Sequence, residues 1–430
     1  LKGAGQLQAL AAIGTDIENV RLAWNHAVTQ KDLESIGLSL ESLHRFYWNE
    51  GRLMQGIKDF ERAVSGLRTD DPVGKRGIVL GELLAFLGRF YWYTGQLNIA
   101  WETLQESLDL LQRLGAREHR LMPLLFLAEM QETLEESASM YEECLVLARE
   151  IGDQWAAGHA LLLLGINSVR AGDYQEAEAS WQEALKNFKQ NRDPGGISYS
   201  LGLLSMLAVD RGRYQEAVSL AQESPDARYA AYWLGQALCA NGRYAQAQEL
   251  LQQVLVLSRE TDDKPLLSQC LFYLGEIAIQ TGDYARAEER IQESLALTVI
   301  SDPWGFVVRN HDALGRVDLA QGEYLHSRGH LRDALKIVIQ LVHLPNLLAI
   351  MTTAAELLAE EGDLAYAAML ATFVKGHLAS QAKVKERAEQ LLTRLKEQLS
   401  DNEQAEIRQR SQLSDLDSLA AQLVTDLEKK

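Results

Sequence analysis

The sequence predicts an all-α protein in which antiparallel helix pairs stack side by side as a solenoid. Small and apolar residues recur at helical spacing, as in the stretch 161–185, LLLLGINSVRAGDYQEAEASWQEAL. A Gly-x-Tyr motif interrupts this periodicity at nearly regular intervals, and a small residue follows most of its glycines by five positions. Only 7 of the 430 residues are proline, which suits a chain that is helical throughout.

The stretch 161–185 also shows why one helix pair needs neighbours. It is typical of two helices joined at Gly172. Gly165 and Ala177 carry little or no side chain, so the two helices can approach closely, while Trp181 fills the space farther along. A single pair of this kind leaves one apolar face uncovered, and a second pair must stack on it. The sequence therefore predicts a repeat protein.

The motif around Gly172 recurs along most of the chain. From Gly172 onward the copies lie 40, 30, 40, 40 and 40 residues apart. The turn glycines are Gly51, Gly95, Gly172, Gly212, Gly242, Gly282, Gly322 and Gly362. The residues five positions after them are Gly56, Ala100, Ala177, Ala217, Ala247, Ala287, Ser327 and Ala367. The short interval before Gly242 predicts a local bend, because the preceding helix ends early at Ser224 and Pro225.

The set formed by Leu164 and Gly165, the turn Gly172-Asp-Tyr, Ala177 and Ala184 resembles the tetratricopeptide repeat. The resemblance implies a right-handed superhelix with a concave groove lined by the first helix of each pair, and a role in binding a protein or a ligand. The spacing here exceeds the common repeat of about 34 residues by roughly six. Turn-forming Asp, Gly and Pro clusters account for the additional length, at 152–154, 192–194, 262–265 and 301–303.

The two ends of the chain differ from the repeats. An amphipathic helix at 16–28 is expected to cover one end of the stack, and charged amphipathic helices are expected at 383–399 and 413–427. Ser414 and Asp417 resemble a capping box. We expect the final helices to cap the array, and a partly detached helical tail is the alternative. The expected domains are an N-terminal capping region at 1–36, a repeat array at 37–375, and C-terminal capping helices or a tail at 376–430.

The composition disfavours several kinds of partner. The 60 acidic and 42 basic side chains give a net charge of −18, which argues against broad contacts with nucleic acid or an anionic membrane. Cys144, Cys239 and Cys270 lack metal-ligand spacing and lie in helical patterns, as expected of reduced core residues in a cytoplasmic protein. No apolar run reaches the roughly 18 residues of a membrane span.

No pattern in the sequence predicts catalysis. Gly74 and Lys75 are followed by Arg76, and the remaining residues of a phosphate-binding loop are absent. His326 and His330 would share a helix face, as some zinc ligands do, but no third ligand lies nearby in the sequence. We therefore expect a protein that is not an enzyme, with no catalytic residues, no cofactor and no metal site.

The tetratricopeptide resemblance points to the groove as the binding surface. It implies that residues three, six, ten and thirteen positions before each turn glycine face inward. Arg45 and Arg89 occupy equivalent inward positions, each three residues before a tryptophan. Arginine beside an aromatic ring suits carboxylates, phosphates or an acidic peptide. The candidate ligand- or peptide-binding residues are Arg45, Trp48, Arg89, Trp92, His159, Tyr199, Tyr229, Tyr232, Gln236, Phe272, Arg309 and Arg316. The same positions also include Leu162, Ile166, Val169, Gly202, Met206, Val209, Cys239, Glu276, Ile279 and Asp312.

A purely structural interpretation of these residues stays open. Aromatic side chains at helical spacing are more often core residues than ligand contacts, so the tryptophans would pack between helices. The arginines would then pair with acidic neighbours such as Glu41 and Glu82.

The chain also resembles the C-terminal helical-repeat part of STAND-class signal-transducing NTPases, which include LuxR-type bacterial transcription regulators. The resemblance rests on 15–24 (TDIENVRLAW), the 40-residue repeats, and 362–370 (GDLAYAAML). It implies a sensor that takes a protein, a peptide or a small inducer in its groove and relieves inhibition of an ATPase domain upstream. Because the sequence begins at Leu1 rather than methionine, we expect it to be part of a longer chain. The alternative is a constitutive protein–protein scaffold that does not switch.

Overall fold

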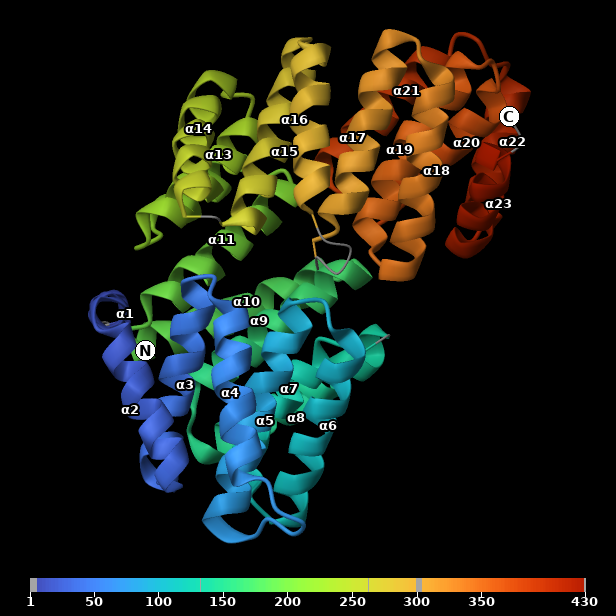
Figure 1. Ribbon diagram of the computed structural model, residues 1–430. Helices are drawn as coiled ribbons and strands as arrows, with labels where there is room; N and C mark the ends of the chain where they lie inside the picture. The colour runs from blue at the N-terminus through green and yellow to red at the C-terminus, as the bar shows by residue number, and fades with distance from the viewer. Residues whose placement is uncertain (1–5, 132, 262, 299–303, 429–430) are drawn as a thin grey trace. The chain divides into compact units, whose positions relative to one another are not determined.

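The computed structural model describes residues 6–131, 133–261, 263–298 and 304–428. All regular secondary structure in these ranges is helical and most helices stack in antiparallel pairs, which confirms the predicted fold class (Figure 1). The cluster expected at 301–303, and residue 262 of another cluster, lie outside the described residues. The chain divides into two compact units, which we describe separately. Unit 1 comprises Leu1–Leu164 and Gln182–Ile197, and unit 2 comprises Gly165–Trp181 and Ser198–Lys430.

The helices of the first half belong mainly to unit 1. Their bounds are α1 (Gln6–Thr15), α2 (Ile17–Gln30), α3 (Leu33–Asn49), α4 (Leu53–Leu67), α5 (Gly74–Tyr93), α6 (Leu97–Arg113), the 3-10 helix η1 (Arg117–Arg120), α7 (Leu121–Ala128) and α8 (Leu134–Ile151). Three helices contribute residues to both units, namely α9 (Gln154–Ala171), α10 (Tyr174–Asn191) and α11 (Pro194–Asp210).

The remaining helices belong to unit 2. Their bounds are α12 (Tyr214–Gln222), α13 (Ala227–Ala240), α14 (Tyr244–Glu260), α15 (Lys264–Thr281), α16 (Tyr284–Leu297), α17 (Phe306–Gln321), α18 (Tyr324–Leu341), α19 (Leu344–Glu360), α20 (Leu364–Gly376), α21 (Ala382–Leu395), α22 (Asp401–Leu413) and α23 (Leu416–Glu428).

The eight predicted turn glycines follow the C-terminal ends of helices and adopt a left-handed backbone conformation. Their φ angles lie between 66° and 93°, a region in which a side chain is strained and glycine is not. Where Asp follows the glycine, its carboxylate caps the next helix. Asp173 accepts a hydrogen bond from the Glu176 N–H at 3.0 Å, and Asp363 accepts one from the Tyr366 N–H at 3.2 Å. The Gly-Asp-Tyr motif is therefore a helix stop followed directly by a helix start.

The two helices of a pair touch at a glycine of the first helix, seven residues before the turn glycine. A Cβ atom added at Gly235 in α13, for example, would meet Leu251 of α14 at 2.8 Å. The large side chains that face these glycines are fully buried. The five contacts are Gly88 with Leu104, Gly165 with Trp181, Gly235 with Leu251, Gly275 with Ile291, and Gly315 with Leu331. Each of these five pairs therefore has a small core of its own, in addition to its contacts with the neighbouring pairs.

The 30-residue interval between Gly212 and Gly242 is caused by a short second helix. α12 has 9 residues, whereas the second helices α14 and α18 have 17 and 18. This pair also lacks the usual glycine contact. Ser205 stands in the glycine position, and its hydroxyl donates to the Ala217 carbonyl at 2.8 Å.

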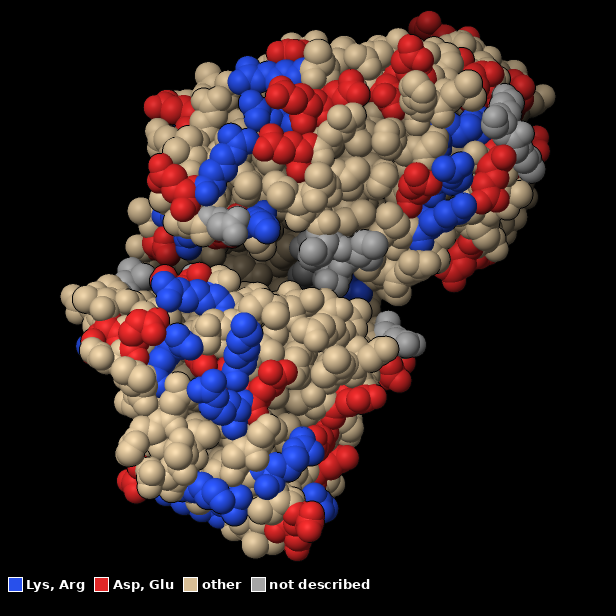
Figure 2. All heavy atoms as spheres, viewed as in Figure 1, with Lys and Arg blue, Asp and Glu red and all other residues tan. Residues whose placement is uncertain are grey.

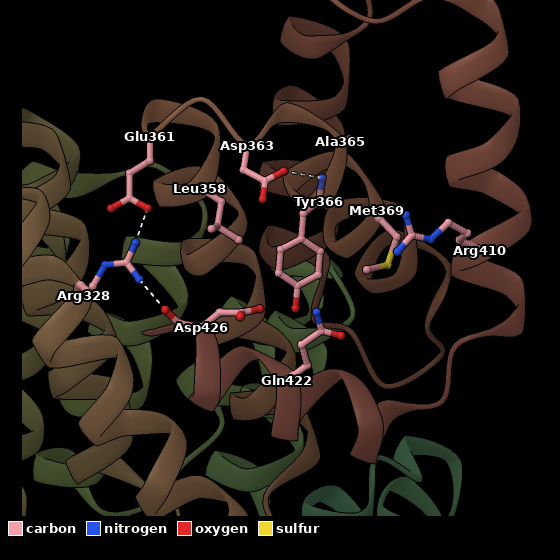
Figure 3. A pocket seen from close by; sticks show the side chains of 10 residues that line it. All are labelled: Arg328, Leu358, Glu361, Asp363, Ala365, Tyr366, Met369, Arg410, Gln422 and Asp426. Atoms are coloured by element: carbon pink, nitrogen blue, oxygen red, sulfur yellow. Dashed lines mark hydrogen bonds and ion pairs between the residues drawn. The ribbon is translucent and has the colours of Figure 1, made fainter. Parts of the chain in front are cut away.

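The C-terminal helices pack on the last repeats of unit 2. Buried Leu391, Ile407 and Leu423, from α21, α22 and α23, belong to a hydrophobic cluster that also includes residues of α18 to α20. Arg328 of α18 fastens α23, because it donates to the Asp426 carbonyl at 2.9 Å while it also pairs with Glu361 (Figure 3). These helices are therefore part of the folded body of unit 2.

The capping box expected at Ser414 is wrong. Ser414 follows the C-terminal end of α22, and Asp415 instead accepts the Ser418 N–H at 2.9 Å at the start of α23. A capping box is present one helix earlier, between Ser400 and Glu403. Two adjacent residues could each have capped α23, and local spacing does not choose between them.

The first testable consequence concerns the contact between the paired helices. We expect Gly165→Ala to destabilise unit 2, because the added methyl group would overlap the indole ring of Trp181, which is fully buried. Overpacking of this kind costs about 1–3 kcal/mol. Urea unfolding of the purified variant measures the free-energy change.

Gly329→Ala in α18 is the matched control for this substitution. Nothing lies within 4 Å of the position that its Cβ would take. The higher helix propensity of alanine should therefore stabilise α18 by about 0.5–1 kcal/mol. A Gly165→Ala variant as stable as the wild type would contradict the close approach of α9 and α10.

Candidate functional site

A cavity within unit 2 is walled by the first helices of successive pairs. α11, α13, α15, α17 and α19 contribute most of its walls, α21 closes one side, and its volume is about 180 Å³. Ten of its 23 lining residues stand at the inward positions given above from the sequence. These are Val169, Met206, Val209, Gln236, Cys239, Phe272, Glu276, Arg309, Asp312 and Arg316.

Four of the twelve candidate binding residues line this cavity, namely Gln236, Phe272, Arg309 and Arg316. Three aromatic candidates in unit 2 do not. Tyr232 is 2% exposed and packs against Tyr273, with ring centroids 6.1 Å apart. Tyr199 and Tyr229 are partly buried in α11 and α13, outside the lining. These three tyrosines therefore lie outside the cavity lining.

The remaining five candidates lie in unit 1. Arg89 forms an ion pair with Glu129 at 2.8 Å. Its guanidinium carbon also lies 4.6 Å from the ring centre of Trp92 and 4.4 Å from that of Tyr93. Trp48, in turn, packs against Tyr93 at 3.6 Å between ring centroids. These residues form a cation–aromatic cluster whose charged members already have partners.

Arg45 and His159 are held in a similar way. Arg45 pairs with Glu41 at 2.8 Å and lies 4.1 Å over the ring of Trp155, against which His159 also packs at 3.9 Å. The Arg45–Glu41 pair is the one that the structural interpretation expects. The suggested pairing of Arg89 with Glu82 is wrong, because Glu82 contacts His119 at 2.7 Å and Arg89 reaches Glu129.

Part of the charge in the unit 2 cavity is internally paired. Arg316 pairs with Glu276 and, at 3.1 Å, with Asp312. Burial acts to raise the pKa of Glu276, but the Arg316 guanidinium outweighs it and holds that pKa below its ordinary value. Arg387 forms an ion pair with Glu356 at 2.6 Å. These arginines brace α15, α17, α19 and α21 against one another.

Arg309 is different, because it has no carboxylate partner in the described part of the chain. Its guanidinium carbon lies 4.6 Å from the ring centre of Phe272 and 4.7 Å from that of Phe306. One Nη donates to the Tyr273 hydroxyl at 3.2 Å. Aromatic stacking fixes the plane of the guanidinium while leaving most of its N–H donors unused.

The Tyr273 hydroxyl joins Arg309 to Gln236. The Nε2 of Gln236 donates to that hydroxyl at 2.5 Å. The other end of the Gln236 amide is buried and has no hydrogen-bond partner. A buried polar atom without a partner costs free energy, and a ligand that donates to it would recover that cost.

The segment between α20 and α21 contacts α10 and α11. Tyr174 donates its hydroxyl proton to the Ala379 carbonyl at 2.8 Å, and Gln381 donates to the Asp210 carboxylate at 3.0 Å. Burial raises the pKa of Asp210 to about 6. Asp210 forms no ion pair in the described residues, although the charge of Arg309 acts to lower its pKa.

Burial makes two of the lining side chains poorly reactive at neutral pH. Burial raises the pKa of Cys239 to about 12, so its thiol stays protonated at neutral pH. Burial lowers the pKa of His343 to about 3, which makes its imidazole a weak base. The described residues also contain no group of three or more His, Cys, Asp or Glu side chains that could hold a metal ion.

A second cavity of about 480 Å³ lies between α18, α20, α22 and α23 (Figure 3). The buried Arg328 side chain in this cavity already pairs with Glu361 and donates a hydrogen bond to α23. Tyr366 presents a hydroxyl without a hydrogen-bond partner, and burial raises its pKa to about 12. The facing Arg410 and Gln422 are exposed. Part of the lining of this second cavity is therefore formed by exposed side chains.

Several cavity residues were not found from the sequence. Asp210 and Tyr273 stand beside predicted inward positions rather than on them. Gln381 and Lys383 lie beyond the last repeat, where no turn glycine gives a reference for counting. The sequence does contain one indication of these cavity residues. Asp210 is a charged residue at the end of an otherwise apolar run.

The face drawn in Figure 2 carries charges of both signs. On this face, Lys and Arg side chains alternate with Asp and Glu over the helices of both units. No described helix combines the length and the apolar character that crossing a membrane requires.

The second testable consequence is a pH dependence that Asp210 confers. The pKa of Asp210 is raised from 3.8 to about 6, so the folded chain holds this proton more tightly than the unfolded chain does. Stability from this group is therefore fully present below about pH 4 and is lost as the pH rises to about 6. Asp210→Asn keeps an acceptor for Gln381 and should be more stable than the wild type at neutral pH by about 1–3 kcal/mol.

Urea unfolding of both proteins between about pH 4 and about pH 7 measures this effect. The difference in unfolding free energy should grow with pH up to about 6 and then stay constant. A difference that does not change over that range would contradict the burial of this carboxylate.

Comparisons with known proteins agree with this architecture. Family models for the tetratricopeptide repeat match residues 162–227 and 226–298, and a model for anaphase-promoting complex subunit 5 matches residues 89–166. None of the curated proteins is similar enough to this chain to match it.

Solved structures show the same kind of fold. A Rap protein in complex with competence and sporulation factor has a TM-score of 0.51 and 13% identity, covering 85% of this chain and 100% of its own. The Rap conjugation gene regulator of plasmid pLS20, in complex with the Phr* peptide, has a TM-score of 0.50 and 15% identity, covering 76% of this chain and 96% of its own. A tetratricopeptide repeat protein from Parabacteroides merdae has a TM-score of 0.40 and 13% identity, covering 65% and 99%. The family models, rather than these structures, identify residues 162–298 as tetratricopeptide repeats, as the sequence predicts.

Proposed function

We propose that unit 2 is a non-catalytic binding module that takes a peptide or a small ligand in the cavity walled by α11, α13, α15, α17 and α19. The observation that carries this proposal is a preformed cavity in which some charged groups are fully paired while Arg309 and Asp210 have no ion-pair partner. Purely structural charges are normally paired when they are buried. Charged side chains that lack an ion-pair partner and line an open cavity favour a ligand-binding site.

The solved structures of similar fold support a peptide as one class of ligand. One Rap protein is in complex with competence and sporulation factor, and the pLS20 regulator is in complex with the Phr* peptide. Their identity to this chain is 13% and 15%, so the likeness concerns the fold, and the choice of ligand rests on the residues of this cavity.

We also propose that the array is the sensor part of a larger cytoplasmic regulator with an ATPase domain of the STAND class. The supporting observations are the segments 15–24 and 362–370, which resemble that class. A ligand can switch such a protein only if it binds one arrangement better than another. The contacts of Tyr174 with Ala379 and of Asp210 with Gln381 supply an element that a ligand in the cavity could strengthen or replace.

The binding proposal is tested by selecting peptides from a random library against the immobilised protein. Selected peptides should lose affinity for Arg309→Gln by about tenfold or more, equivalent to about 1.4 kcal/mol, because a charged donor is removed from the wall. Fluorescence anisotropy with labelled peptides measures the change.

Arg259→Gln is the matched control, since Arg259 lies outside the cavity in α14 and pairs with Glu293 on the surface. Its affinity should equal that of the wild type. Selection that yields no peptide, or only peptides that bind both variants equally well, would rule out the cavity as the peptide site.

The regulatory proposal is tested in the full-length protein from which this array comes. ATP turnover should rise when a peptide selected on the array is added, and the rise should be absent in the Arg309→Gln protein. A peptide that binds without changing ATP turnover would favour the constitutive scaffold instead.

A further inference from the structure

The unpaired groups in the unit 2 cavity indicate what kind of ligand it takes, provided that the proposed binding function is correct. Four cations line the cavity. Arg316 and Arg387 are committed to carboxylates of the protein. Arg309 donates one hydrogen bond, to the Tyr273 hydroxyl, and Lys383 makes no hydrogen bond or ion pair with any described residue. Two of the four cations thus remain available to a ligand.

Arg309 and Lys383 line the same cavity. Arg309 reaches it from α17, and Lys383 lies two residues after Gln381, whose side chain contacts Asp210 on the same wall. The Arg309 guanidinium carbon lies close to the rings of Phe272 and Phe306, which restrict its movement. A guanidinium with free N–H donors, accompanied by an ammonium group, is suited to a carboxylate.

The wall also presents acceptors that can take a further hydrogen bond. Asp210 receives one hydrogen bond, from Gln381, and no cation lies within ion-pair distance of it in the described residues. One end of the Gln236 amide is buried without a partner. Gln236 and Arg309 donate to the same Tyr273 hydroxyl, so the Gln236 amide lies beside the Arg309 guanidinium. Asp210 lines the same cavity. A ligand that donates an N–H beside its carboxylate would satisfy both sets of groups.

The size of the cavity limits the ligand further. Its volume of about 180 Å³ lies below the range of about 300–1,000 Å³ that is usual for drug-sized ligands. Phe272, Val308 and Met206 provide apolar wall area for one side chain. The space therefore suits one residue rather than a long peptide.

We infer that this cavity holds a single amino-acid residue with a free α-carboxylate. The carboxylate lies between Arg309 and Lys383, and the α-nitrogen donates toward Asp210 and Gln236. Two sources supply this chemistry, a free amino acid and the C-terminal residue of a peptide. They differ at the nitrogen, which is a charged ammonium group in the first and a neutral amide in the second.

The experiment is a calorimetric titration of the protein with three forms of each common amino acid. The forms are the free L-amino acid, its N-acetyl derivative and the N-acetyl amide, which lacks the carboxylate. We expect at least one side chain for which the carboxylate form binds about tenfold or more tightly than the amide. Arg309→Gln and Lys383→Met should each reduce this preference, and Arg259→Gln should leave it unchanged.

Asp210→Asn distinguishes the two sources. If the natural ligand is a free amino acid, the variant should lose binding of the ammonium form, because its counter-charge is gone. If the ligand is a peptide end, the N-acetyl form should bind at least as well as the free amino acid, and the variant should retain it. A peptide ending in the preferred residue should then bind, and its C-terminal amide should not.

Equal binding of carboxylate and amide forms would overturn the inference, as would a preference that both Arg309→Gln and Lys383→Met retain. So would the failure of every form to bind. Library peptides that still require Arg309 would in each case leave the proposed binding function standing. Loss of folding is checked by thermal melting, and Lys383→Met remains informative if Arg309→Gln does not fold, since Lys383 has no structural partner in the described residues.

Discussion

The rest of this structure depends on the close contact between the two helices of each pair. In five of the pairs, a glycine in the first helix lets a buried side chain of the second, such as Trp181 or Leu251, reach the helix backbone. With 3.6 residues per turn, the residues three, six, ten and thirteen positions before the turn glycine then lie about 40–120° around the first helix from that contact. Fixing the pair therefore also fixes which side chains face the cavity.

Stacking these pairs brings distant parts of the chain to one cavity. Tyr174 and Ala379 are 205 residues apart and are joined by a hydrogen bond, and the Asp210–Gln381 contact spans 171 residues. The cavity is thus bounded by the repeats on one side and by the segment that follows them on the other. A ligand held there would contact both, which is the arrangement that couples binding to a change of shape.

The charges of the cavity divide into those that stabilise the array and those that do not. Arg316 sits between Glu276 and Asp312, so its burial is compensated by the protein itself. Asp210 has no comparable partner, and its raised pKa reflects the cost of holding that carboxylate ionised. A residue that weakens the folded state while facing an open site is typical of a position kept for function.

The sequence by itself determined the periodicity, the eight turn glycines and the inward register of residues such as Phe272 and Arg316, because these follow from local backbone preferences and helical spacing. The sequence did not determine which side chains contact one another. Arg89 meets Glu129 rather than Glu82, Trp48 packs on Tyr93, and Lys383 reaches the cavity from beyond the last repeat. Only the tertiary structure decided these contacts, because the choice among acidic, aromatic and basic neighbours depends on distances between helices, which no local pattern in the sequence records.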